Sequence, residues 1–143
     1  MWDQVIEQER VVETLRRAVE QNRVAHAYLF HGPDGSGKKA TALALAAALL
    51  CERQGGNSCG KCLACTKVKR LIHPDVHVFL PHPKDADVDD LAARIQRLAE
   101  NPYAEVDYTR RPNLADPTAT SNKQAMFSVE MVNGDIKRTM GFR

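Results

Sequence analysis

The chain has 143 residues, with 20 Lys or Arg against 18 Asp or Glu and a formal net charge of +2. This length suits one domain with its own hydrophobic core. No apolar run reaches the ~20 residues of a membrane-spanning helix, and the apolar segment at residues 40–50 lies too far inside the chain for a secretion signal. The composition excludes a membrane protein and a signal-bearing secreted protein, so we expect a cytoplasmic one.

Charge is divided unevenly. Residues 1–70 carry 11 Lys or Arg against 7 Asp or Glu, whereas residues 71–143 carry 9 against 11. The basic excess of the first half hints at a polyanionic partner, but it is far from the dense basic stripe that indicates DNA binding by itself.

The first half predicts a helix, a strand and a second helix. Residues 8–22 place apolar side chains on one helical face, and Asn22 predicts the end of that helix. Residues 27–31 form a short apolar run that predicts a buried parallel strand. Residues 38–52 are rich in Ala and Leu, which favour a helix. The apolar face of the first helix comprises Val11, Val12, Leu15, Ala18 and Val19.

A glycine-rich loop joins the strand to the second helix. It matches the phosphate-binding pattern G-x-x-x-x-G-K-[ST] at Gly32, Gly37 and Lys38 and departs from it at Lys39. In the complete motif backbone N–H groups surround the phosphates, the lysine reaches their oxygens, and the final hydroxyl binds Mg²⁺. An ammonium group cannot bind a cation, so the Mg²⁺ site is impaired. The alternative is a glycine-rich turn that binds nothing.

We therefore expect weak binding of ATP or ADP at this loop and predict no catalytic residue. A helix that begins at the loop adds its dipole and free amides to the anion site. The expected nucleotide-binding residues are Gly32, Pro33, Asp34, Gly35, Ser36, Gly37, Lys38, Lys39 and Ala40.

All cysteines of the chain fall within fifteen residues: Cys51, Cys59, Cys62 and Cys65. The last three lie on a tight turn, and the first, at the end of the predicted helix, can supply a fourth ligand. Such a set is typical of a structural zinc site, in which four protein ligands leave no position for water. Two disulfides or four free thiols are the alternatives, and disulfides suit a chain without a secretion signal poorly. We place the zinc module at about residues 51–70.

The second half predicts further elements. Residues 76–80 indicate a second strand, and acidic residues open a helix from Asp87 that Asn101 and Pro102 end. Residues 102–125 predict a loop or disordered insert, with 104–109 a weak strand candidate. Ser128 predicts the cap of a last helix.

Several segments occur together in a diagnostic order. They are residues 2–8 (WDQVIEQ), residues 24–32 (VAHAYLFHG), the phosphate loop, residues 49–51 (LLC), the cysteine turn and residues 73–75 (HPD). In this order the chain resembles the N-terminal AAA+ module of bacterial DNA polymerase III clamp-loader subunits. The resemblance covers residues 2–80 well and 126–143 loosely.

The resemblance implies a P-loop NTPase fold of the RecA-like three-layer α/β/α type, with a small inserted zinc module. It implies a partial domain over residues 1–143 that stops before the Walker B strand. It also implies partners: the gamma/tau and delta subunits, the sliding clamp and, through the complex, primed DNA. In this family the gamma/tau motor carries Thr after the loop lysine, whereas delta-prime subunits often have a degraded loop. Lys39 favours a non-hydrolysing delta-prime type, with an active ATPase as the alternative.

In the implied sheet, residues 27–31 and 76–80 are not neighbours. Both would expose unpaired backbone groups, which invite pairing. We expect either direct pairing of the two strands or self-association of chains through these edges.

Overall fold

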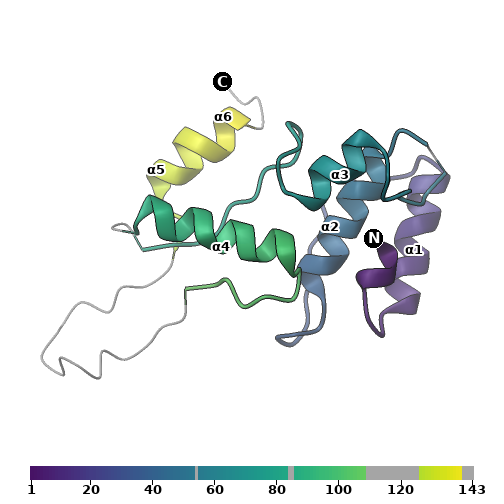
Figure 1. Cartoon of the computed structure of the whole chain (residues 1–143), viewed down its shortest axis with the longest axis horizontal. Coiled ribbons are helices and arrows are strands. Elements are labelled where there is room, and N and C mark those ends of the chain that lie inside the picture. Colours follow the sequence, from purple (N-terminus) through teal and green to yellow (C-terminus); the bar gives the residue numbers. More distant parts are fainter. Residues whose placement is uncertain (54, 84–85, 109–125, 140–143) are drawn as a thin grey trace, which may run out of the picture. The chain divides into compact units, whose positions relative to one another are not determined.

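The computed structural model describes residues 1–53, 55–83, 86–108 and 126–139. They belong to two compact units, one of Met1–Val76 with Gln96–Ala104 and one of His77–Ile95 with Glu105–Arg143. The described elements are η1 (Trp2–Gln4), α1 (Glu9–Glu20), α2 (Lys38–Leu50), α3 (Leu63–Lys69), α4 (Val88–Glu100), α5 (Val129–Met131), the π-helical turn η2 (Val132–Ile136) and α6 (Lys137–Thr139) (Figure 1).

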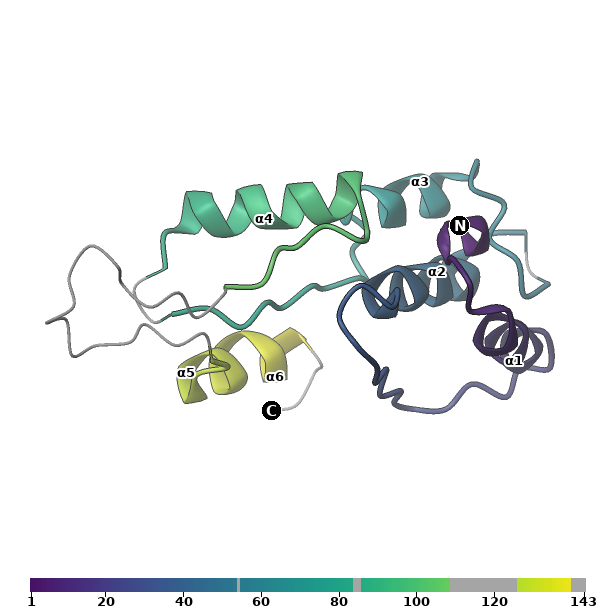
Figure 2. The same ribbon diagram turned by 90° about the horizontal axis from the view of Figure 1, so that it is seen from below.

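Helix α2 forms the centre of the first unit. It contacts α3, α1 and η1, and Figure 2 shows it between α1 and α3. Its composition explains this position, because small alanine side chains on several faces let neighbouring helices approach closely. The core around it consists of Trp2, Leu15, Ala44, Leu45 and Ala48, with Met1, Val5, Val12, Val19 and Phe30 packed against it.

Helix α1 confirms the helix predicted over residues 8–22, including the role of Asn22. The chain leaves α1 with Asn22 in the left-handed region, at φ 51°. The Asn22 N–H donates to the Val19 carbonyl at 3.1 Å, and the Arg23 N–H donates to the Ala18 carbonyl at 2.8 Å. This pair of bonds is the Schellman arrangement, which satisfies carbonyl groups at a helix end.

The predicted three-layer α/β/α fold is wrong for the described part of the chain, which contains helices and no β-strand. Residues 27–31 and 76–80, predicted as strands, run without regular secondary structure. A strand exists only through hydrogen bonds to a neighbouring strand, and an apolar run by itself does not supply that neighbour. Direct pairing of these two segments is likewise not observed among the described residues. The β-pairing found there is a single bridge between His82 and Met126, with both N···O distances 3.3 Å.

In the second unit, the Arg94 side chain of α4 contacts residues 106–108, which follow the helix in sequence. Its Nε donates to Asp90 Oδ2 at 2.9 Å, and one of its terminal nitrogens donates to the Val106 carbonyl at 2.9 Å. The guanidinium also lies 3.8 Å from the centre of the Tyr108 ring. The strand proposed over residues 104–109 is therefore not formed at its described positions, 104–108, where side-chain contacts replace a backbone ladder.

The remaining helical predictions stand. Acidic Asp89 and Asp90 lie in the first turn of α4. The Ser128 Oγ accepts a hydrogen bond from the Met131 N–H at 3.1 Å, which confirms the predicted cap. Most of the predicted insert, residues 109–125, lies outside the described residues. No helix in the described ranges has the length and apolarity needed to cross a membrane.

Candidate metal centre and phosphate-binding loop

The fold brings all four cysteines together. Their Sγ atoms lie within 4.8 Å of one another. Cys51 follows the last residue of α2, and Cys65 lies inside α3; both are buried, whereas Cys59 and Cys62 are half-buried. Helix α3, which the sequence did not predict, positions two of the ligands, because Cys62 caps it and Cys65 stands one turn further on.

Backbone N–H groups point at three of the sulfur atoms. The Cys59 N–H donates to Cys51 Sγ at 3.3 Å, the Cys62 N–H to Cys59 Sγ at 3.3 Å, and the Cys65 N–H to Cys62 Sγ at 3.4 Å. Hydrogen bonds to sulfur favour the thiolate, which is the form that binds metals. The backbone follows this path because Gly60 adopts φ 68°, a conformation that suits glycine.

Two thiols of the cluster, those of Cys59 and Cys65, differ in acidity. Hydrogen bonds from the backbone of Lys61 and Cys62 lower the pKa of Cys59 to about 6. Burial raises the pKa of Cys65 to about 12, and its thiol donates to the Ala47 carbonyl at 3.9 Å. Binding a divalent cation would require that proton to leave, as in other thiolate sites.

The residues fit a zinc ion. Four thiolates at about 2.3 Å from Zn²⁺ in a tetrahedron place the sulfur atoms about 3.8 Å apart, so the observed cluster needs only a small contraction. All four cysteines are free, which argues against the disulfide alternative. A set of four soft sulfur donors is typical of structural zinc.

The glycine loop ends at Gly37, directly before the first residue of α2. Gly37, the residue before the helix, adopts φ 84°. The Lys38 Nζ donates to the Gly32 carbonyl at 2.9 Å and the Pro33 carbonyl at 2.6 Å, and it lies 3.8 Å from Asp34 Oδ1. The Lys38 ammonium is thus bonded to carbonyl groups of its own loop. In a phosphate-binding loop the same ammonium would instead contact phosphate oxygens.

No hydroxyl stands where the motif requires one. Lys39 occupies the second position of α2. The next hydroxyl, on Thr41, is buried and donates to the Gly37 carbonyl at 2.9 Å. Thr41 is therefore engaged by its own helix and does not replace the missing Mg²⁺ ligand.

A cavity of about 630 Å³ adjoins this loop. Its size is in the range of small-molecule sites, roughly 300–1,000 Å³. The nucleotide-binding residues predicted from the sequence include those of the glycine loop that line this cavity. The lining residues of α1 were not predicted as part of a site. Val11, predicted on the apolar face of this helix, is 40% exposed and lines the cavity. Its lining comprises Gln8, Arg10, Val11, Thr14, Leu15, Tyr28, Leu29, Phe30, His31, Gly32, Pro33, Ser36, Lys38 and Thr41.

Comparison with known proteins gives a consistent family. The family model described as "DNA polymerase III, delta subunit" matches residues 7–108. Among curated proteins, DNA polymerase III subunit delta' of Bacillus subtilis is 38% identical over 81 residues, 56% of this chain and 25% of that protein. The delta' subunit of Pseudomonas aeruginosa is 43% identical over 65 residues, 45% of this chain and 20% of that protein.

DNA polymerase III subunit tau of Bacillus subtilis is 40% identical over 76 residues, 52% of this chain and 14% of that protein. The chain therefore spans a quarter or less of the length of these three relatives. No solved structure matches.

Proposed function

We propose a role in the clamp loader of DNA replication for this chain, which belongs to the DNA polymerase III delta-subunit family. The names of its delta' and tau relatives support this role. The chain would act with the gamma/tau and delta subunits to load the sliding clamp onto primed DNA. It would reach the DNA as a member of that complex.

Within this role we propose the non-hydrolysing delta-prime type. The observation that carries the choice is Lys39, which stands where Mg²⁺ would require a hydroxyl. The engagement of Thr41 with Gly37 supports it, because the nearest hydroxyl downstream is already bonded. Similarity to the tau subunit, at 40% identity, favours an ATPase motor as the second candidate.

Nucleotide binding at this loop is proposed to be weak. ATP or ADP would lie along residues 32–40, with Lys38 exchanging its bonds to Gly32 and Pro33 for phosphate oxygens. Loss of these two bonds lowers the favourable free energy of nucleotide binding, because the Gly32 and Pro33 carbonyls lose their hydrogen-bond donor. The same residues, without a metal ligand at position 39, would hold phosphate without activating it.

The cysteine cluster is proposed to hold one structural Zn²⁺. The ion would join the end of α2 to α3 through Cys51, Cys59, Cys62 and Cys65. Four thiolates leave no position for a reacting water, so the ion would supply folding energy rather than chemistry.

ATP turnover by the purified chain tests the delta-prime assignment. The matched control is Lys38→Ala, which removes the lysine of the loop and any activity that depends on it. We expect the natural chain and the control to give the same background rate. Turnover that Lys38→Ala abolishes would overturn the assignment and favour the motor subunit.

A further inference from the structure

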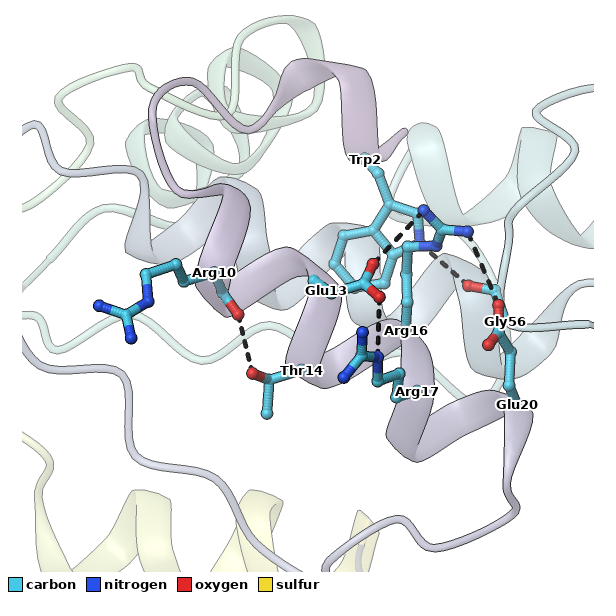
Figure 3. A network of polar contacts seen from close by, with 8 residues as sticks. All are labelled: Trp2, Arg10, Glu13, Thr14, Arg16, Arg17, Glu20 and Gly56. Atoms are coloured by element: carbon cyan, nitrogen blue, oxygen red, sulfur yellow. Dashed lines mark hydrogen bonds and ion pairs between the residues drawn. The ribbon is translucent and has the colours of Figure 1, made fainter.

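The single tryptophan of the chain is bonded to the loop that separates the first two cysteines. The Trp2 indole Nε1–H donates to the Gly56 carbonyl at 3.0 Å, across 54 positions of sequence (Figure 3). Trp2 is 8% exposed and belongs to the core formed by α1 and α2. Gly56 lies between Cys51 and Cys59, so this one bond connects the N-terminal segment to the cysteine cluster.

The conformation in which the loop makes this contact favours glycine at position 56. Gly56 adopts φ 75°, which side-chain-bearing residues rarely adopt. A methyl group at this position would overlap the side chain of Glu20. Glu20 is itself placed by Arg16, whose terminal nitrogen lies 3.7 Å from Glu20 Oε1 (Figure 3). The Glu20 side chain at the end of α1 therefore lies next to Gly56, whose carbonyl accepts the hydrogen bond from Trp2.

From these contacts we infer that Trp2 and Gly56 position the loop for metal binding, so that the metal centre and the N-terminal segment stabilise each other. The inference rests on the proposed zinc centre. Cys51 and Cys59, the ligands at either end of this loop, approach each other through the Cys59 N–H bond to Cys51 Sγ. A loop held at Gly56 keeps these two ligands in place before the ion arrives.

The coupling is reciprocal by thermodynamic necessity. A contact that raises metal affinity must itself be stabilised by the metal to the same extent. Metal binding would thus strengthen the hold on Trp2 in its core position, and loss of the metal would weaken that hold. Because the chain has one tryptophan, its emission reports this segment alone.

The first arm of the test separates the metal centre from the coupling. Co²⁺ is titrated into metal-free chain, and absorbance from Co²⁺–thiolate bonds gives the stoichiometry and affinity of the site. Zn²⁺ is titrated in parallel while tryptophan emission is recorded. We expect one equivalent of either ion to bind, and the emission to shift to shorter wavelength up to one equivalent of Zn²⁺. Absence of Co²⁺–thiolate absorbance would overturn the proposed zinc centre.

The second arm uses two neighbouring glycines as a matched pair. Gly56→Ala collides with Glu20, whereas Gly55→Ala, also at positive φ, meets no neighbouring atom. We expect Gly56→Ala to weaken Co²⁺ binding about tenfold more than Gly55→Ala does, the size typical of residues that support metal ligands. Trp2→Phe, which keeps an aromatic ring but loses the indole N–H donor, should also weaken Co²⁺ binding. Far-ultraviolet circular dichroism checks that each variant is helical.

The coupling is contradicted if the natural chain binds one equivalent of metal without a change in tryptophan emission. It is equally contradicted if Gly56→Ala and Trp2→Phe, both helical, bind Co²⁺ as tightly as Gly55→Ala and the natural chain.

Discussion

The Lys38 ammonium and the Gly32 carbonyl, at the two ends of the phosphate loop, are joined by a hydrogen bond of 2.9 Å. The bond closes the loop on itself, and a nucleotide must break it to reach the lysine. Together with Lys39 beside it, this bond is the reason we propose that the loop binds nucleotide only weakly.

Lys39→Thr should make nucleotide binding depend on Mg²⁺. The substitution restores the hydroxyl that the motif places on the cation. We expect Mg²⁺ to tighten ATP binding to the variant by about tenfold, or ~1.4 kcal/mol, because the restored hydroxyl adds an oxygen ligand to the cation. Mg²⁺ should leave binding to the natural chain unchanged. Isothermal titration calorimetry with and without Mg²⁺ measures both, and an equal Mg²⁺ effect on the two chains would refute the role given to position 39.

One Zn²⁺ per chain should be lost when a cysteine ligand is replaced. Cys65→Ser removes a buried ligand inside α3, whereas Ser58→Ala leaves all four cysteines in place and serves as control. Metal analysis of protein purified without added zinc should give one equivalent for the natural chain and the control, and less than half for Cys65→Ser. Less than half an equivalent in the natural chain would disprove the zinc centre.

Helix α2 offers two leucines for a stability comparison. Leu45 is 6% exposed and belongs to the core, whereas Leu49 is 47% exposed. Leu45→Ala should lower the free energy of unfolding by about 2–5 kcal/mol, the usual cost of a core cavity. Leu49→Ala should lower it by less than about 1 kcal/mol. Urea denaturation followed by circular dichroism measures both, and equal losses would contradict the core described around α2.

The segment at residues 27–31 should promote self-association. Leu29 is 93% exposed, and this segment forms no strand with any described residue. Unpaired extended segments with apolar side chains tend to pair with other chains. Sedimentation velocity should show concentration-dependent association of the natural chain that Leu29→Lys reduces. Such contacts commonly form at about 100 µM protein. If the natural chain and the Leu29→Lys variant are both monomeric at that concentration, the expectation is wrong.

The sequence predicted local features well, because they depend on neighbouring residues. The end of α1 at Asn22 and the Ser128 cap follow from backbone and side-chain chemistry within one turn. The cysteine cluster was also predictable, since its members lie within fifteen residues.

Features that depend on distant partners were not predictable. Residues 27–31 have the composition of a strand, yet strand formation requires a partner that the composition does not specify. The bond between Trp2 and Gly56 joins residues 54 positions apart, and no pattern in the sequence pairs them. Val11 shares the apolar face of α1, but only the packing reveals that it lines a cavity.

Purification of the tagged protein from its own cells tests the clamp-loader role most directly. The protein is isolated at physiological salt, and the proteins recovered with it are identified by mass spectrometry against an untagged control. We expect gamma/tau and delta subunits of DNA polymerase III to be recovered in stoichiometric amounts. Recovery of well-expressed, folded protein without any DNA polymerase III subunit would contradict it.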